Sequence, residues 1–279
     1  MDYHSDRFED FSLMIYMGNS LIGLLPANLK DNTLYSHQGL TYGGLFLESN
    51  YSIDSIFIAL RDYLIEFEIE YLKIRSLPVI YQSANSKRVT NYLQGISSIL
   101  YHSNKVLAID YSLPLNIHKT KLKHYRKNHI KGFEIREESS FESFWNRVLI
   151  PRLKSRHNTS PVHTLNEITL LKSRFIEQIK QYNIYLKGEI LAGITIFDKG
   201  HVVKSQYGAT NDLGENQRAL EYLFIELIYK YKTEGKRYFS MGTVMDDAYP
   251  EGYNVGLMRQ KIELGCKEYQ QDYYEIKLV

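Results

Sequence analysis

The chain has 279 residues, enough for two compact units or one large one, because a domain typically holds about 150 residues. Hydrophobic residues make up 44% and charged residues 24%, which are values of a globular protein and exclude a chain that is disordered throughout. With 34 Lys and Arg against 32 Asp and Glu the net charge is only +2, so a site for anions must be a local cluster.

The lone cysteine, Cys266, excludes an intrachain disulfide and a Cys-rich zinc site. No apolar run approaches the roughly 18 residues of a membrane span. The N-terminal sequence MDYHSDRFEDF is polar and acidic, unlike a signal peptide, which is basic and then apolar. We therefore expect a cytoplasmic protein that does not insert into a membrane.

Two segments have the pattern of the same β-hairpin. Residues 12–25 and residues 182–196 each consist of two apolar stretches joined by a turn that contains Gly. Glycine supplies the positive φ that tight hairpin turns need. Gly23 and Gly193 stand at matching places after the two turns. The chain is therefore predicted to contain one structural design twice.

The elements after each hairpin also match. They are a strand (33–36 and 201–209), an amphipathic helix (53–67 and 217–232) and a short strand (71–74 and 237–240). A strand-helix-strand crossover favours parallel neighbours, whereas a hairpin is antiparallel, so each sheet should be mixed. We predict an α/β (α+β) protein of two tandem duplicated modules, each with a mixed sheet flanked by helices.

A basic helical segment between the two copies, residues 118–131, is predicted to open the second module. A strand at 105–111 and Pro114 precede it, so we place the boundary near residue 113. The N-terminal module then spans 1–113 and the C-terminal module 114–279. In the latter we expect a strand at 133–136 and helices at 140–154 and 164–174, with Pro151 bending or ending the first of these helices.

Five short runs carry a family resemblance. They are YHSDRF (3–8), SHQGLTYGGL (36–45), PVHTL (161–165), SQY (205–207) and GLMRQK (256–261). In these runs the chain resembles bacterial proteins of the GNAT N-acyltransferase superfamily, and most of all its double-domain FemAB-like branch. That fold is two GNAT modules in tandem, which agrees with the repeat. The family has a strand and a helix ahead of its first run, so the resemblance implies a first module without these elements.

The resemblance implies transfer of an acyl group to an amine. In GNAT proteins the donor is acetyl-CoA or another acyl-CoA, whereas FemAB-type peptidoglycan enzymes use an aminoacyl-tRNA. The leading hypothesis is an acyl-CoA-dependent N-acyltransferase acting on an amino-sugar or nucleotide-sugar of surface polysaccharide. The alternatives are an aminoacyl-tRNA-dependent transferase of cell-wall synthesis, the only one with a nucleic acid partner, and a non-catalytic binding protein on the same fold.

In the GNAT plan the pyrophosphate of the donor lies against backbone N–H groups of a loop that enters a helix. The matching segment here is 210–219, which keeps only one glycine of the family's Arg/Gln-x-x-Gly-x-Gly/Ala pattern and adds Asp212 and Glu215, whose charges repel phosphate. The residues expected to contact CoA are Gly214, Arg218 and Ala219. The alternative is a plain connection between a strand and a helix.

The resemblance places an acidic residue in the loop after the strand that ends at Gly242, where Asp246 stands. A carboxylate there is suited to take the proton from the attacking ammonium, so Asp246 is the candidate general base. The family's usual Asp before the glycine is Ser240 here, which implies an altered acceptor or lost activity. The alternative is a loop carboxylate without a role.

His37, Gln38 and Tyr42 lie in a glycine-rich loop, which lets the backbone approach a ligand closely. An imidazole and a phenol there are suited to acid–base work or to binding hydroxyl groups. We predict that His37 and Tyr42 are catalytic and that Gln38 contacts the substrate. The alternative is a structural histidine packed with tyrosine.

The remaining predicted substrate contacts lie in the second module. His157 and His163 flank Pro161 without the carboxylate or Cys spacing of a zinc site, so no metal is expected. Arg126, in the basic segment 118–131, is suited to bind phosphate bidentately, although that segment also fits a solvated helix face. The others are Gln206 and, in an expected helix over 254–265, Asn254 as N-cap, Gln260, Lys261 and Glu263.

Overall fold

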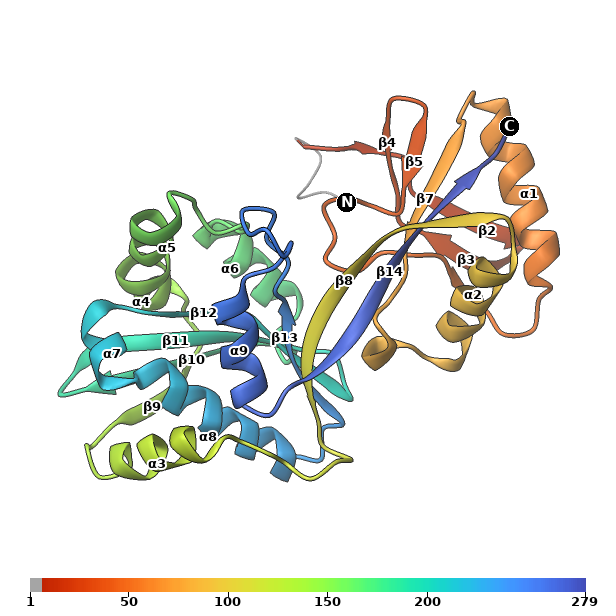
Figure 1. Cartoon of the computed structure of the whole chain (residues 1–279). Coiled ribbons are helices and arrows are strands. Elements are labelled where there is room, and N and C mark those ends of the chain that lie inside the picture. Colours follow the sequence, from red (N-terminus) through yellow and green to blue (C-terminus); the bar gives the residue numbers. More distant parts are fainter. Residues whose placement is uncertain (1–6) are drawn as a thin grey trace. The chain divides into compact units, whose positions relative to one another are not determined.

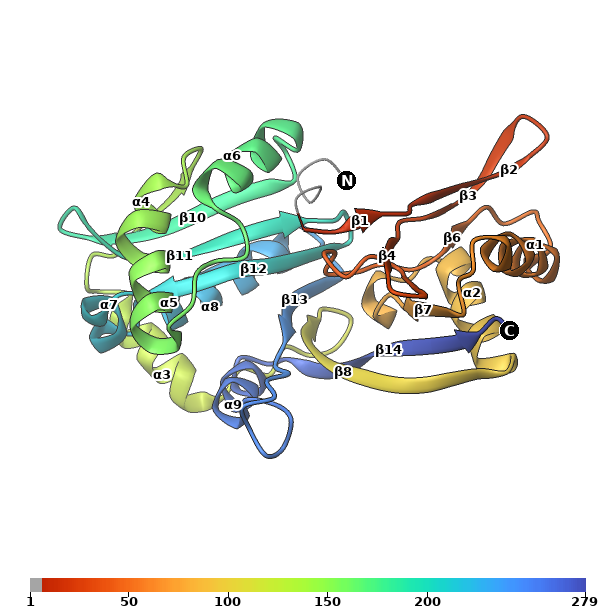
Figure 2. The same cartoon turned by 90° about the horizontal axis from the view of Figure 1, so that it is seen from above.

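A computed structural model describes residues 7–279, and its elements are labelled in Figures 1 and 2. The chain divides into two compact units: unit 1 holds the chain up to Lys105 together with Tyr269–Val279, and unit 2 holds Val106–Glu268. The sequence hypothesis, a single boundary near residue 113, differs in two respects. Strand β8 (Ser98–Asp110) runs through the boundary, and strand β14 (Lys267–Lys277) returns to unit 1, where it pairs antiparallel with β7 (Tyr71–Arg75).

The described part of unit 1 contains two sheets and two α-helices. Its strands are β1 (Glu9–Asp10), β2 (Leu13–Met17), β3 (Ser20–Leu25), β4 (Asn28–Lys30), β5 (Thr33–Tyr35), β6 (Phe46–Leu47), β7, β14 and the first part of β8, and its helices are α1 (Ile53–Glu66), α2 (Ala84–Gly95) and the 3-10 turn η2 (Val79–Tyr81). The larger sheet runs in the order β1-β4-β5-β7-β14-β8, and the smaller in the order β2-β3-β6.

The core of unit 1 lies between its strands and the inner faces of α1 and α2. Leu60 and Leu64 of α1 and Leu93 of α2 pack with Leu72 and Ile74 of β7. Since side chains alternate along a strand, Lys73 and Arg75 belong to the opposite face of the sheet. Ser52 begins α1, and its hydroxyl accepts from the N–H of Ser55, as the sequence predicts.

Unit 2 has one sheet, in which most neighbouring strands are antiparallel, and helices cover both of its faces. Its strands are β9 (Glu134–Glu138), β10 (Ile179–Leu186), β11 (Glu189–Asp198), β12 (Val202–Thr210), β13 (Tyr238–Thr243) and the end of β8. Its helices are α3 (Lys119–Asn128), α4 (Glu142–Phe144), the π-helical turn η3 (Trp145–Leu149), α5 (Ile150–His157), α6 (Leu165–Arg174), α7 (Asp212–Gln217), α8 (Ala219–Thr233) and α9 (Val255–Glu263).

Two cores flank this sheet. On one face Leu223 and Ile228 of α8 pack with Ile194 of β11. On the other face Phe144 and Trp145 pack with Ile190. Figure 2 shows α8 and α3 on one side of β10–β12 and α4–α6 on the other. Because β11 is covered on both faces, its residues are apolar without alternation.

The predicted duplication of elements is present. The crossovers through α1 and α8 each join parallel strands, β5 with β7 and β12 with β13. In each hairpin the register of the two strands shifts between the matching glycine and the turn. Gly23 pairs with Ile15, and Gly193 pairs with Asn183. The predicted class, mixed α/β with mixed sheets, is confirmed.

The two copies also differ. In unit 2 the hairpin continues into the main sheet, because β11 pairs with β12. In unit 1 the hairpin belongs to the small sheet, because β3 pairs with β6 instead of β5. Pro26 directly follows β3 and cannot donate to a ladder, which ends this strand before β4 begins.

The structure refines two of the predicted helices and leaves part of one sequence run undescribed. The helix predicted over 217–232 is α8, which begins at Ala219, and a short helix that was not predicted, α7, precedes it; Arg218 in the left-handed conformation (φ 56°) separates the two. Pro151 does not end its helix, because the π-helical turn η3 precedes it and the chain stays helical to His157. Most of the run 3–8 lies outside the described residues. Within residues 7–279 no helix is long and apolar enough to cross a bilayer.

Candidate active site

Unit 2 has a groove beside β12, formed by two adjoining pockets of about 400 and 330 Å³. Gly208, Leu220 and Gln260 line both pockets, so we describe them together as the β12 groove. One end of the groove lies at the loop between β12 and α8, and the other lies beside the end of β13. Its volume is in the range of small-molecule sites.

The groove exists because two parallel strands stop pairing. Strands β12 and β13 pair only from Val202 to Lys204, opposite Tyr238 to Ser240. Beyond these residues β12 continues along β11, while the register of β13 against β8 becomes irregular after Ser240. The second pocket is lined from both strands in this region, by Gln206 and by Thr243 among others. Backbone groups that the sheet leaves unused are therefore close to a ligand placed here.

Lys261 of α9 places a buried ammonium group in the groove, and two hydrogen bonds hold this group in position. Its Nζ donates to the main-chain oxygens of Met241 (2.6 Å) and Thr243 (2.8 Å), and the residue is 8% exposed. Burial lowers the pKa of Lys261 to about 8. No carboxylate pairs with it within residues 7–279. Lys261 therefore brings a positive charge into the groove that no acid balances.

A second buried lysine lines the same pocket. Lys204 of β12 is 9% exposed, and its Nζ donates to Oε1 of Gln206 at 2.7 Å. Burial, followed by the charge of Lys261, lowers the pKa of Lys204 to about 8. A pKa near 8 leaves both groups mainly protonated at neutral pH, so this pocket suits a ligand atom that carries or develops negative charge.

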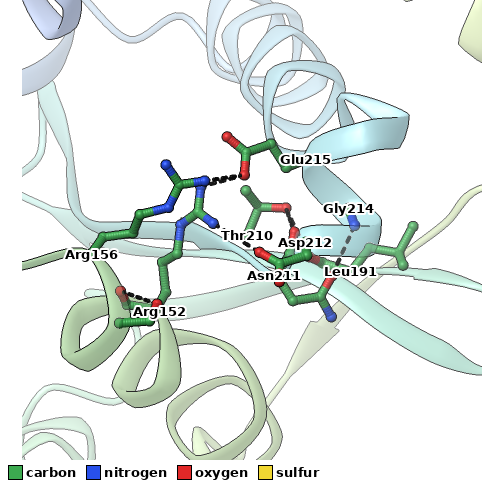
Figure 3. Close-up of polar contacts among 9 residues, drawn as sticks. Arg152, Arg156, Leu191, Thr210, Asn211, Asp212, Gly214 and Glu215 are labelled. Carbon is green, nitrogen blue, oxygen red and sulfur yellow. Dashed lines mark hydrogen bonds and ion pairs between the residues drawn. The ribbon is translucent and has the colours of Figure 1, made fainter.

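The other end of the groove carries carboxylates, as Figure 3 shows. Glu215 accepts from Arg152 (2.7 Å) and Arg156 (2.9 Å), and Asp212 accepts from Arg152 (3.2 Å). The hydrogen bond from Arg152 is the main reason that the pKa of Glu215 lies below its usual value. The two arginines are thus already engaged by acidic side chains of the loop.

Gly214 has a structural reason to be glycine. Its N–H donates to Oδ1 of Asn211 (2.8 Å), which begins α7. A Cβ at this position would stand 2.3 Å from the main-chain oxygen of Leu191 and 2.4 Å from Oγ1 of Thr210. The close approach of the loop to β11 therefore requires a residue without a side chain.

A third carboxylate, Glu221 of α8, also lines this end of the groove. Its Oε2 pairs with Nζ of Lys121 at 2.7 Å, and Lys121 also contacts Glu263 at 3.3 Å. Both partners of the shorter pair are largely buried, with side-chain exposures of 9% and 12%. Glu263 in addition accepts from Arg259, so it belongs to an ion-pair network that joins α3, α8 and α9.

The groove brings together six of the residues that the sequence singles out. They are His157, Gln206, Gly214, Arg218, Gln260 and Lys261. Six others in unit 2, Asp246 among them, do not line it. Ala219 is fully buried in the core, Arg126 is exposed on α3, Asn254 caps α9 by accepting from the N–H of Leu257, and Glu263 and His163 bond to neighbouring protein groups.

His163 is held by Tyr207 rather than presented to the groove. The Tyr207 hydroxyl lies 2.5 Å from His163 Nδ1 and accepts from the His163 N–H at 3.1 Å. The main-chain oxygen of His163 in turn accepts from the indole N–H of Trp145. The residue thus fastens the segment before α6 to β12 and η3.

Asp246, the candidate base, is half-buried and lines neither pocket of the groove. Its Oδ1 accepts from the N–H of Ala248 at 3.1 Å, and its own N–H donates to the oxygen of Gly252. In this structure the carboxylate closes a turn of the loop after β13. A catalytic role for Asp246 stays a prediction.

The predicted loop residues of unit 1 are held by three different partners: the loop itself, β4 and the turn η2. His37 has a left-handed backbone (φ 57°), and its Nδ1 accepts from the N–H of Gly39 at 3.1 Å. Gln38 donates its N–H to Asn28 and accepts from the amide of the same residue. Tyr42 donates to the Tyr81 hydroxyl at 3.2 Å. His37 and Gln38 line a pocket of about 110 Å³, and Tyr42 is not among its lining residues.

Sequence reasoning missed Lys204 and Arg152 in unit 2 and Arg75 in unit 1. Lysine and arginine on a strand or helix usually face solvent, so the sequence offers no signal that these three are half-buried or buried. Within residues 7–279 no group of three or more His, Cys, Asp or Glu side chains is arranged to hold a metal ion.

Comparison with solved structures identifies the fold. The chain is similar to FemX (TM-score 0.68, 9% identity, over 97% of this chain and 88% of FemX). It is also similar to L-PGS from Bacillus licheniformis (TM-score 0.62, 10% identity, 94% and 83%). A third is a DUF2156 domain from Agrobacterium fabrum, provisionally assigned to a lysylphosphatidylglycerol synthetase (TM-score 0.62, 7% identity, 95% and 83%). No family model matches the sequence, and no curated protein is significantly similar to it.

These similarities bear out the resemblance seen in the sequence. The chain has the GNAT fold in its double-domain, FemAB-like form. At about 10% identity or less the likeness concerns the fold and not the activity.

Proposed function

We propose that the protein is an acyltransferase whose donor is an aminoacyl ester, as in aminoacyl-tRNA, and that the β12 groove receives the reacting carbonyl group. This is the alternative of the sequence analysis rather than its leading hypothesis, acyl-CoA. The fold similarity to FemX supports it, because FemAB-type enzymes are the branch that uses aminoacyl-tRNA. The similarity to a domain assigned to a lysylphosphatidylglycerol synthetase, an enzyme named for an aminoacyl product, points the same way.

The observation that carries the proposal is Lys261. A buried ammonium without an acidic partner, fixed by two main-chain oxygens, costs free energy of folding unless a ligand makes use of it. Acyl transfer offers such a use. When an amine attacks an ester carbonyl, the carbonyl oxygen becomes an oxyanion, and a preorganised positive charge stabilises this oxygen more than it stabilises the ground state.

The proposed transfer passes through a tetrahedral intermediate. The amine nitrogen forms a bond to the carbonyl carbon while the π electrons move to the oxygen, near Lys261 and Lys204. The intermediate then collapses, the bond to the ester oxygen breaks, and the departing alkoxide takes a proton to become the free hydroxyl group of the donor. The nitrogen loses its proton to a base. Asp246 is the proposed base, and His37 and Tyr42 are retained as proposed acid–base or acceptor-binding groups of unit 1.

The acidic end of the groove argues against an acyl-CoA donor. A pyrophosphate at the start of α8 would face Glu215 and Glu221, while Arg152 and Arg156 are already paired with Glu215. Electrostatic repulsion therefore replaces the attraction that a helix N-terminus usually offers to phosphate. The acceptor remains as proposed from the sequence, an amine of a polar molecule such as an amino-sugar or nucleotide-sugar.

The test measures acyl transfer from an aminoacyl-tRNA donor and the dependence of this transfer on Lys261. Purified protein is mixed with tRNA charged with radiolabelled amino acids and with amino-sugar acceptors, and transfer of label is followed. Lys261→Met should reduce transfer by about 10²–10³, because it removes one oxyanion-stabilising group. Lys232→Met, on the exposed side of α8, is the matched control and should keep full activity.

The donor is tested separately by calorimetry with acetyl-CoA. We expect no saturable binding at millimolar concentration. Saturable binding together with acetyl transfer would contradict the aminoacyl donor and return the protein to the acyl-CoA hypothesis. Full activity of Lys261→Met with either donor would contradict the role of the lysine.

A further inference from the structure

Unit 1 has a small pocket of its own, remote in sequence from the β12 groove. Its volume is about 110 Å³, and its walls include His37 after β5, Lys73 and Arg75 of β7, and the rings of Tyr101 and Tyr273. We refer to it as the Arg75 pocket. All its residues belong to unit 1, so its shape depends on this unit alone.

The strand register places these side chains on one face of the sheet. Lys73 lies opposite Tyr35 of β5, and Arg75 lies opposite Tyr273 of β14. Residues that face one another across a ladder share a face of the sheet. Leu72 and Ile74 take the other face, in the core. Because apolar and charged residues alternate along β7, the side chains of Lys73 and Arg75 lie on the face of the sheet that does not pack against the core.

The two cations of the pocket, Lys73 and Arg75, differ in whether a carboxylate neutralises them. Lys73 pairs with Glu275 at 2.9 Å, and this hydrogen bond raises the pKa of Lys73. Arg75 has no carboxylate partner within residues 7–279. Its Nη1 donates to the main-chain oxygen of Leu40 at 2.6 Å, and its guanidinium lies 5.0 Å from the centre of the Tyr273 ring. One positive charge therefore remains unbalanced in the pocket.

The tyrosine walls do not supply the missing negative charge. Burial is the main cause that raises the pKa values of Tyr101 and Tyr273, so both phenols stay neutral at physiological pH. Tyr273 also receives a hydrogen bond from Asn104 at 2.6 Å, which holds the ring in place. Arg75 is thus oriented by Leu40 and Tyr273 without being neutralised.

We propose that the Arg75 pocket binds an oxyanion, a carboxylate or phosphate group at the end of a larger ligand. The planar guanidinium offers parallel N–H donors that match such a group. The pocket has room for one group of this size, since a water molecule takes about 30 Å³ in the liquid, and the rest of the ligand lies outside. The pocket is separate from the β12 groove, although it shares His37 with the groups proposed for acyl transfer.

The experiment follows the Arg75 side chain directly. The full chain, labelled with ¹⁵N, is titrated separately with inorganic phosphate and with acetate at constant ionic strength. The Nε–H signal of Arg75 is recorded together with the backbone N–H signals of the pocket residues Lys73 and Tyr273, which also report on the variant without Arg75. Saturable shifts at millimolar ligand are expected. Tighter binding of phosphate identifies a phosphate group as the ligand, and tighter binding of acetate identifies a carboxylate.

Two variants make the test specific. Arg75→Gln should weaken the binding about tenfold or more, since it removes a charge-assisted hydrogen bond. Arg88→Gln is the control, because Arg88 also donates to main-chain oxygens, those of Ser49 and Tyr51, but lies outside the pocket. Its binding should equal that of the wild type.

The proposal fails if neither anion gives a saturable shift of the Arg75 signal in the wild type, or if both variants lose binding equally. The wild-type titration decides the matter even where Arg75→Gln does not fold. Since Lys261→Met leaves unit 1 untouched, its binding of anions should be normal whether or not the proposed transferase activity is found.

Discussion

The ammonium of Lys261 lies 2.6 Å from the main-chain oxygen of Met241, so α9 is joined to β13 through a buried charge. The same ammonium also reaches Thr243, at the far end of the strand. The bonds satisfy carbonyl groups at the place where β13 has left β12. The lysine that is proposed to act in catalysis is therefore also part of the frame of the groove.

The first prediction concerns pH and stability. Burial lowers the folded-state pKa of Lys261 to about 8, below that of an unfolded lysine. Between the two pKa values the unfolded state binds more protons, so this residue's contribution to stability rises with pH across that window. We expect the free energy of unfolding of the wild type, relative to Lys261→Met, to increase by up to about 3 kcal/mol from about pH 7 to about pH 10.

Urea unfolding at a series of pH values measures this difference. Lys232→Met should show no such trend relative to the wild type, because its side chain is exposed. Parallel curves for the wild type and Lys261→Met would show that the lysine has an ordinary pKa.

The second prediction concerns Glu215, which engages Arg152 and Arg156. Glu215→Gln removes the negative charge and leaves the two arginines available to phosphate oxygens. We expect the affinity for inorganic pyrophosphate, measured by calorimetry, to rise about tenfold. Stability should fall by less than about 1 kcal/mol, because the pairs are partly exposed. Glu234→Gln is the control, and an unchanged affinity in Glu215→Gln would show that the carboxylate does not occupy an anion position.

The third prediction compares two glycines. Gly214→Ala would bring a Cβ to within 2.3 Å of a main-chain oxygen, which cannot move without displacing β11. We expect a loss of about 1–3 kcal/mol in the free energy of unfolding. Gly95 ends α2 and would meet no atom within 4 Å, so Gly95→Ala should be neutral or stabilising by up to about 1 kcal/mol. Equal effects of the two substitutions would contradict the packing described for the loop.

The fourth prediction concerns Cys266, which is 4% exposed. Burial raises the pKa of its thiol to about 12, so the reactive thiolate is scarce in the folded protein at neutral pH. A thiol reagent such as 5,5′-dithiobis(2-nitrobenzoic acid) should modify native protein at least about 100-fold more slowly than urea-unfolded protein. Rapid modification under native conditions would show that the end of α9 opens readily.

Local patterns predicted the local structure well. The turn glycines predicted both hairpins. Ser52 correctly predicted the start of α1, and Asn254 that of α9. These features depend on neighbours in the chain. The groove depends instead on where β12 and β13 separate, which no local pattern records. For this reason Lys204 was not singled out from the sequence, although Lys261 and Gln260, which line the same pocket, were.

Long-range pairing also explains why the division into two units differs from a single boundary near residue 113. The sequence analysis predicted no strand after residue 265, and no local pattern there names the partner of β14, which is β7, almost 200 residues earlier. Likewise Arg75 becomes part of a pocket only because Tyr273 lies opposite it. The residues were visible in the sequence, but their juxtaposition was not.

The return of β14 to unit 1 has a consequence for synthesis on the ribosome. All of unit 2 emerges before Tyr273, Tyr274 and Glu275, which complete the sheet of unit 1 beside β7. Unit 2 can thus finish folding while unit 1 still waits for its strand, although the first residues of unit 1 emerge first. During this interval the open edge of β7 is a site for mispairing with other nascent chains.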